Sequence, residues 1–122
     1  MDRLMDRQTT AQDIREQIDY DFLCRQYRRE QVDEIVSIML EVQSKKGGEF
    51  QISRNNCFDT AFVQERFSRI GQGHVEMVLD ALNEITGGVK NMHAYLLTSL
   101  FNSVATLDHY YTARVNHDLY GG

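Results

Sequence analysis

The sequence predicts a mainly α-helical protein, a compact bundle of about five to six helices with a minor β-hairpin near residues 49–58. Three observations predict this fold. Proline, the strongest helix breaker, is absent from the 122 residues, although average usage of about 5% would give about six. Apolar residues recur at helical spacing in most segments. Glycine is left to separate those segments, most visibly at Gly47-Gly48 and Gly87-Gly88.

The N-terminal part is predicted to hold a lead-in and a first helix. Residues 1–9 are polar and lack periodicity, so we expect a flexible lead-in there. Thr10 is a suitable N-cap for a helix that runs through Ile14 and Ile18. Apolar and acidic residues alternate over residues 18–23, which predicts a turn at that point.

The clearest single helix is predicted for residues 29–44. Two lysines and a glycine at residues 45–47 suit its C-terminal end, because cations complement the helix dipole and glycine stops the helix. Its apolar residues form one stripe at helical spacing: Val32, Ile35, Val36, Met39 and Leu40.

A short hairpin is expected to follow this helix. Phe50 and Ile52 alternate with polar residues, residues 54–56 are typical of a turn, and residues 57–58 are expected to form the return strand. Two strands alone are marginally stable, so the hairpin must pack on helices.

Four more helices are predicted, each from an apolar stripe. The first begins at Asp59 or Thr60, the second between residues 71 and 74, and the third at Asn91. A separate last helix is expected from about Thr106. The larger stripes of the bundle are expected to bury one set of side chains together: Val36, Met39, Leu79, Leu82, Leu96 and Leu100.

Composition narrows the class of protein. The formal net charge is -5, so the molecule as a whole is not a polyanion binder, and contact with nucleic acid would need a local basic patch. No apolar run is long enough to span a bilayer, and the N-terminus has no signal-peptide h-region, so we expect a cytoplasmic protein with no membrane partner.

Cys24 and Cys57 are expected to be buried thiols. Residues 10–122 are predicted to form a single helical domain.

Three phrases stand out in the last third of the chain: HVEMVLDAL (residues 74–82), NMHAYLLTSLFN (residues 91–102) and YYTARVNHDLYG (residues 110–121). They resemble the C-terminal domain of replication initiator protein A, found on plasmids and conjugative elements of Firmicutes. Shorter upstream matches are IRE, IDYD, VDEIV and ERF, so the resemblance runs from about Asp13 to Gly122. It also extends, less closely, to the helical domain of DnaD-like primosome proteins.

The resemblance implies a non-catalytic accessory domain of a mobile-element replication initiator. Such a domain is expected to contact host replication proteins or a second copy of itself. The DnaD-like resemblance implies an alternative, direct binding of single-stranded DNA. The chain departs from the family pattern at Ser103-Val104, where Ala-Pro is usual, at the helix start near Asp59, where proline is usual, and at Gly71, where a polar capping residue is usual.

No residue pattern indicates an enzyme, a cofactor or a small-molecule substrate. The chain has no HExxH or CxxC motif, and His109 and His117 are too far apart along a helix to share one metal ion, so no metal is expected. Gly71 and Gly73 precede a helix but do not form a phosphate-binding motif, and His74 is interpreted as a packing or capping residue.

Basic and aromatic residues supply the candidate interaction site. Arginine with tyrosine is typical of single-strand stacking and also of energetic hot spots in protein interfaces. The same residues also fit a structural role, in which tyrosines divide between core and surface and arginines pair with the many carboxylates. The candidates are Arg66, Arg69, Lys90, His93, Tyr110, Tyr111, Arg114 and His117.

Overall fold

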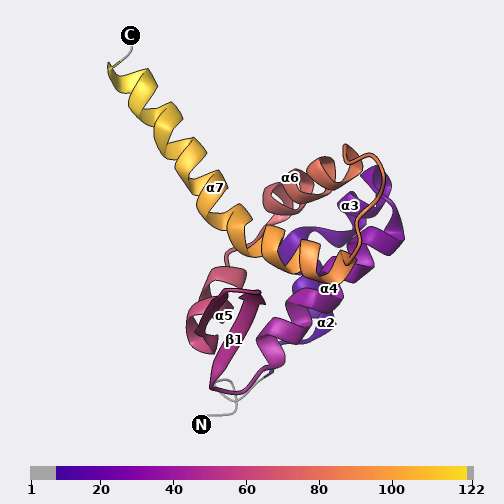
Figure 1. Cartoon of the computed structure of the whole chain (residues 1–122). Coiled ribbons are helices and arrows are strands. Elements are labelled where there is room, and N and C mark those ends of the chain that lie inside the picture. The colour runs from indigo at the N-terminus through magenta and orange to yellow at the C-terminus, as the bar shows by residue number, and fades with distance from the viewer. Residues whose placement is uncertain (1–7, 121–122) are drawn as a thin grey trace.

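The computed structural model describes the backbone of residues 8–120 and the side chains of residues 8–107. Within that range the chain forms six helices and one two-stranded antiparallel sheet (Figure 1). The prediction of a mainly α-helical fold with a minor hairpin is confirmed. The predicted lead-in lies largely outside the described residues. The elements are α2 (Ala11–Ile18), α3 (Tyr20–Gln26), α4 (Arg29–Ser44), β1 (Glu49–Ser53), β2 (Asn56–Asp59), α5 (Thr60–Phe67), α6 (Gln72–Asn83) and α7 (Met92–Tyr120).

The first helix has the start and the turn that the sequence predicts. The Thr10 hydroxyl accepts a hydrogen bond from the Asp13 amide at 3.2 Å, and the Asp13 carboxylate accepts one from the Thr10 amide at 2.9 Å. This reciprocal capping box satisfies two backbone donors at the start of α2. The helix ends at Ile18 because Asp19 adopts the left-handed conformation, with φ 58° and ψ 62°, and α3 then begins at Tyr20.

The hairpin is joined to the bundle by α4 and α5. Gly47 and Gly48 have φ of 63° and 74°, which a side chain disfavours, and they turn the chain from α4 into β1. The Thr60 hydroxyl donates to the Gly47 carbonyl at 2.9 Å, and its amide donates to the Gly48 carbonyl at 3.0 Å. These bonds fix the start of α5 beside the start of the hairpin.

The start of α6 depends on a histidine. Gly71, the N-cap, has no side chain to offer, and its own amide donates to Nδ1 of His74 at 3.0 Å. His74 therefore serves as the capping partner at the third position of the helix, which confirms its interpretation as a capping residue.

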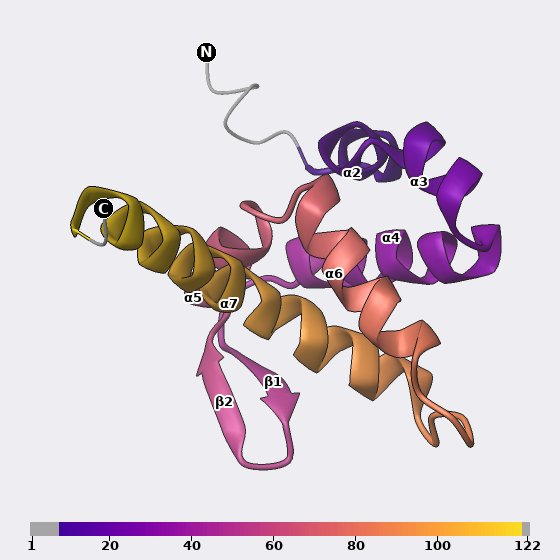
Figure 2. The same cartoon turned by 90° about the horizontal axis from the view of Figure 1, so that it is seen from above.

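One helix replaces the two predicted at the C-terminus. The expectation of a separate helix from about Thr106 is wrong, because α7 continues without a break from Met92 to Tyr120. Neither proline nor glycine lies within that range, so nothing removes a backbone hydrogen bond or favours a turn there. The C-terminal half of α7 extends beyond the other elements in both views (Figures 1 and 2).

The core lies where the N-terminal half of α7 meets α4, α5, α6 and β1. The side chains predicted to be buried together are all in it, each at most 7% exposed: Val36, Met39, Leu79, Leu82, Leu96 and Leu100. From the hairpin, Phe50 and Ile52 point into the same core. The helical stripes of the sequence are therefore the packed faces of the bundle.

Candidate protein-interaction surface

An arginine and three phenylalanines from three elements form a cluster on the surface. Phe58 lies on β2, Phe62 and Arg66 lie on α5, and Phe101 lies on α7. The ring centroids of Phe58 and Phe101 are 5.1 Å apart, those of Phe58 and Phe62 5.5 Å, and those of Phe62 and Phe101 6.2 Å. We call these four residues the Arg66–phenylalanine cluster. The hairpin and α5 both contact α7, which brings the three elements of the cluster together (Figures 1 and 2).

Phe62 is the exposed member of the cluster, because of the way α5 is oriented, whereas Phe101 is buried. Val63 and Phe67 are four residues apart on α5 and both are fully buried, so they define its inner face. Phe62 and Arg66, also four apart, share the adjacent face. Phe101 and Phe58 cover part of this face, and Phe62 remains 44% exposed. A large apolar side chain is thus held in water beside a cation.

Arg66 is held against the rings and has hydrogen-bonding capacity left over. Its guanidinium carbon lies 4.3 Å from the ring centroid of Phe101 and 5.1 Å from that of Phe62, within cation–π range. Nη1 donates to the Phe101 carbonyl at 3.4 Å. Nε is buried and has no hydrogen-bond partner among the described residues. A partly desolvated cation therefore lies on an aromatic surface without a carboxylate partner in the part of the chain that the structure describes.

Of the predicted site residues whose side chains the structure describes, only Arg66 belongs to the cluster. Arg69 is exposed in the turn that follows α5 and pairs with Glu65 near the end of α5, at 3.6 Å. Lys90 is exposed in the loop before α7. His93, in the first turn of α7, has Nε2 2.8 Å from the Glu41 carboxylate of α4. His93 precedes Phe101 by eight residues, or about 12 Å along a helix, so Lys90 and His93 do not join the cluster.

Four other candidates, Tyr110, Tyr111, Arg114 and His117, fall on α7, and their side chains lie outside the described residues. Only their backbone positions along α7 are described. Tyr110, Arg114 and His117 occupy positions i, i+4 and i+7, which share one face of a helix.

The sequence contained one signal that pointed to the cluster, the four-residue spacing of Phe62 and Arg66. That spacing alone does not show that Phe62 lies outside the inner face of α5, which Val63 and Phe67 form. The meeting of α5 with α7 is a tertiary contact that no spacing along the chain predicts. The expectation that both thiols are buried is wrong, since Cys57 on β2 is exposed and Cys24 is half-buried.

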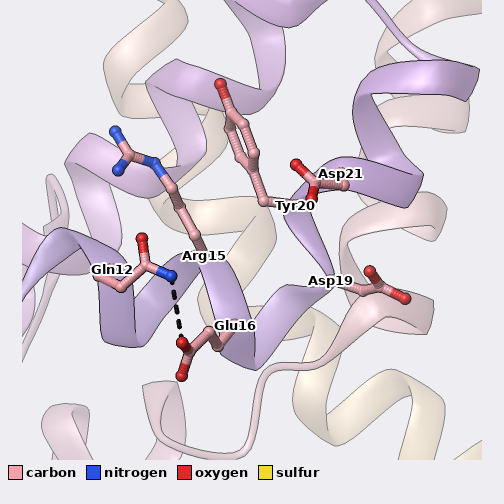
Figure 3. A pocket seen from close by; sticks show the side chains of 6 residues that line it. All are labelled: Gln12, Arg15, Glu16, Asp19, Tyr20 and Asp21. Atoms are coloured by element: carbon pink, nitrogen blue, oxygen red, sulfur yellow. Dashed lines mark hydrogen bonds between the residues drawn. The ribbon is translucent and has the colours of Figure 1, made fainter.

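A polar hollow of about 420 Å³ lies at the turn between α2 and α3 (Figure 3). Arg15 stands over the ring of Tyr20 at 5.3 Å, and Gln12 donates to Glu16 at 3.1 Å. The Tyr20 hydroxyl donates to Asp33 at 2.5 Å, and this hydrogen bond, with burial, raises the pKa of Tyr20 to about 12. These side chains already have structural partners, so the hollow is best explained as the surface of a helix turn.

The described residues show neither a metal site nor a membrane-spanning helix. No group of three or more histidine, cysteine, aspartate or glutamate side chains among them is placed to hold a metal ion. None of the described helices is both long enough and apolar enough to span a bilayer.

Comparison with known proteins places the chain in a family. No curated protein and no solved structure matches it. One family model, described as a family of unknown function (DUF6017), matches residues 6–122. That description assigns no activity, and the relation to replication initiators therefore remains a proposal. Because the match covers nearly the whole of the sequence, the chain belongs to the DUF6017 family.

Proposed function

We propose that the chain is a non-catalytic accessory domain of a mobile-element replication initiator, and that it contacts host replication proteins or a second copy of itself in the cytoplasm. The resemblance of residues 74–82, 91–102 and 110–121 to initiator C-terminal domains supports the replication setting. The family assignment supports a helical domain of unknown function and adds nothing on the setting.

The observation that carries protein contact is the Arg66–phenylalanine cluster. Binding hot spots in protein interfaces are rich in arginine and aromatic side chains that are held rigid and partly shielded from water. Phe62 is held by Phe58 and Phe101, and Arg66 is held by stacking and by the Phe101 carbonyl. Such preorganised side chains lose little rotamer freedom on binding, so the entropic cost of binding is smaller.

Direct binding of single-stranded DNA is the second candidate. It rests on the helical spacing of Tyr110, Arg114 and His117 and on the extension of that part of α7 beyond the bundle (Figure 1). The net charge of -5 opposes it, and two of the described candidates, Arg69 and His93, already face carboxylates.

Binding measurements on the whole chain test both candidates. The chain is titrated with a set of purified bacterial replication proteins and, separately, with a fluorescent oligothymidylate over a series of salt concentrations, while sedimentation reports self-association. We expect saturable protein binding or a dimer, and no DNA binding at tens of micromolar protein. DNA affinity that falls steeply with salt, without protein binding or self-association, would replace the first candidate with the second.

A further inference from the structure

The chemistry of the Arg66–phenylalanine cluster indicates what kind of group it can bind. Arg66 uses one nitrogen for the Phe101 carbonyl, while its buried Nε has no hydrogen-bond partner and no carboxylate pairs with it among the described residues. The chain has 18 acidic residues, and its neighbouring cation Arg69 pairs with Glu65. Arg66 is therefore an unneutralised, partly desolvated guanidinium, and an added carboxylate would compensate its charge more effectively than at an exposed site.

The surroundings of Arg66 suit a single anionic group. Asp59 and Glu65 lie three positions before and three positions after Phe62, and both are exposed. They would repel a chain of phosphates, which needs several cations along its path. A single carboxylate needs only one cation, and a ring attached to it can cover the exposed side of Phe62.

We propose that the Arg66–phenylalanine cluster is a docking site for a protein segment that presents a carboxylate next to an aromatic ring. The carboxylate pairs with the Arg66 guanidinium, and the ring packs on the exposed face of Phe62, where aromatic pairs gain energy beyond the area they bury. This inference rests on the proposed function as a protein-binding domain, and it names the chemistry of the partner at that site.

The minimal probe is N-acetylphenylalanine, which carries one carboxylate and one phenyl ring. It is titrated into the isotope-labelled chain while amide chemical shifts are recorded. Because a ligand of this size is expected to bind with a Kd of about a millimolar, the titration extends to about 20 mM. We expect saturable shifts centred on Phe58, Phe62, Arg66 and Phe101, and about tenfold weaker binding of N-acetylphenylalaninamide, which lacks the charge.

Three variants separate the roles of charge and ring. Arg66→Gln is expected to bind the acid no better than the amide, and Phe62→Ser to weaken both about tenfold. Arg69→Gln is the control, because Arg69 lies one turn away and pairs with Glu65, and it is expected to leave the Kd unchanged. If Arg66→Gln does not fold, Phe62→Ser still tests the proposal, because Phe62 is 44% exposed and contributes little to the core.

Three outcomes would overturn the proposal. The first is no saturable shift, or shifts centred away from the cluster. The second is equal affinity for acid and amide. The third is tighter binding of an oligothymidylate than of the probe at the same residues, which would assign the cluster to nucleic acid. Any of these results together with saturable binding of a replication protein would reject the carboxylate chemistry and leave the proposed function standing, whereas loss of all protein contact would reject both.

Discussion

At the scale of single residues, glutamine side chains join the ends of helices. Gln64 on α5 donates from Nε2 to the carbonyls of Val42 and Lys45, at 3.0 and 2.8 Å, at the C-terminal end of α4. Carbonyls at a helix end have no partner within the helix, and α4 ends in extended backbone at Lys45 rather than in a glycine cap. Gln64 therefore adds a second donor to the Val42 carbonyl, which also accepts from the Lys45 amide at 3.4 Å, and it supplies a donor to the Lys45 carbonyl.

Replacement of Gln64 with alanine tests this role. We expect Gln64→Ala to lower the free energy of unfolding by about 1–3 kcal/mol, because two hydrogen bonds are lost and the Val42 carbonyl keeps only its 3.4 Å bond from the Lys45 amide. Urea denaturation measures the change. Gln12→Ala is the control, since Gln12 is exposed and bonds only to Glu16. An equal effect of the two substitutions would show that the end of α4 does not depend on Gln64.

The hydrogen bonds of Tyr20 and Tyr27 make the stability of the folded chain depend on pH in the alkaline range. The Tyr27 hydroxyl donates to Asp80 at 2.7 Å, and burial followed by this hydrogen bond raises the pKa of Tyr27 to about 12. Tyr20, bonded to Asp33, also has its pKa raised to about 12. Because the unfolded value is about 10, the unfolded chain loses these protons first. The stability that they contribute is present below pH ~10 and is lost as pH rises toward ~12.

An alkaline titration checks this prediction. Phenolate absorbance is expected to show two hydroxyl groups that ionise well above the ordinary pH for tyrosine, and Tyr27→Phe is expected to remove one of them. The same variant should lose less stability than the parent between pH ~10 and ~12. Ionisation of both groups near pH ~10 in the folded protein would show that the hydrogen bonds to Asp33 and Asp80 do not form.

At the scale of elements, the turn between α2 and α3 stores backbone strain. Asp19 is the one residue other than glycine with positive φ among the described residues, and its side chain does not cap α3. Asp19→Gly is therefore expected to leave stability unchanged or raise it by up to about 1 kcal/mol, while Asp19→Val lowers it by about 1–2 kcal/mol. Thermal unfolding of both variants measures the difference. Equal stability of the two would mean that the residue is not left-handed in solution.

The continuity of α7 is consistent with the residues at positions 103 and 104. The initiator domains that the sequence resembles usually have Ala-Pro there, whereas Ser103 and Val104 lie within α7 with both side chains buried. The double substitution Ser103→Ala/Val104→Pro removes a backbone hydrogen bond and introduces a ring clash, so we expect a loss of about 3 kcal/mol or more. Circular dichroism and denaturation measure it. Unchanged helicity and stability would indicate that the parent helix already breaks there.

At the scale of the whole molecule, hydrophobic periodicity in the sequence predicts which face of each helix is buried, and local capping residues predict where a helix begins. The stripes of α4, α6 and α7 identified the core because a helix can bury only one face, and Thr10 identified a helix start because its cap is local. The sequence pattern does not predict which distant segments of the chain contact one another. Phe58, Phe62 and Phe101 come together only because the hairpin, α5 and α7 pack against one another, and the basic candidates separate for the same reason.

We propose that this helical domain binds protein through the Arg66–phenylalanine cluster. Two exposed apolar side chains of similar exposure allow a matched comparison: Phe62, 44% exposed in the cluster, and Ile85, 40% exposed after α6. Neither substitution to serine should disturb the core, so any difference in binding reports the surface. The measurement is the Kd for the bound replication protein, or for the dimer, of the parent, Phe62→Ser and Ile85→Ser chains.

We predict that Phe62→Ser weakens this binding at least tenfold, as loss of a hot-spot side chain does, while Ile85→Ser leaves the Kd within about twofold. Parent-like binding by Phe62→Ser, or a larger loss in Ile85→Ser, would contradict the account.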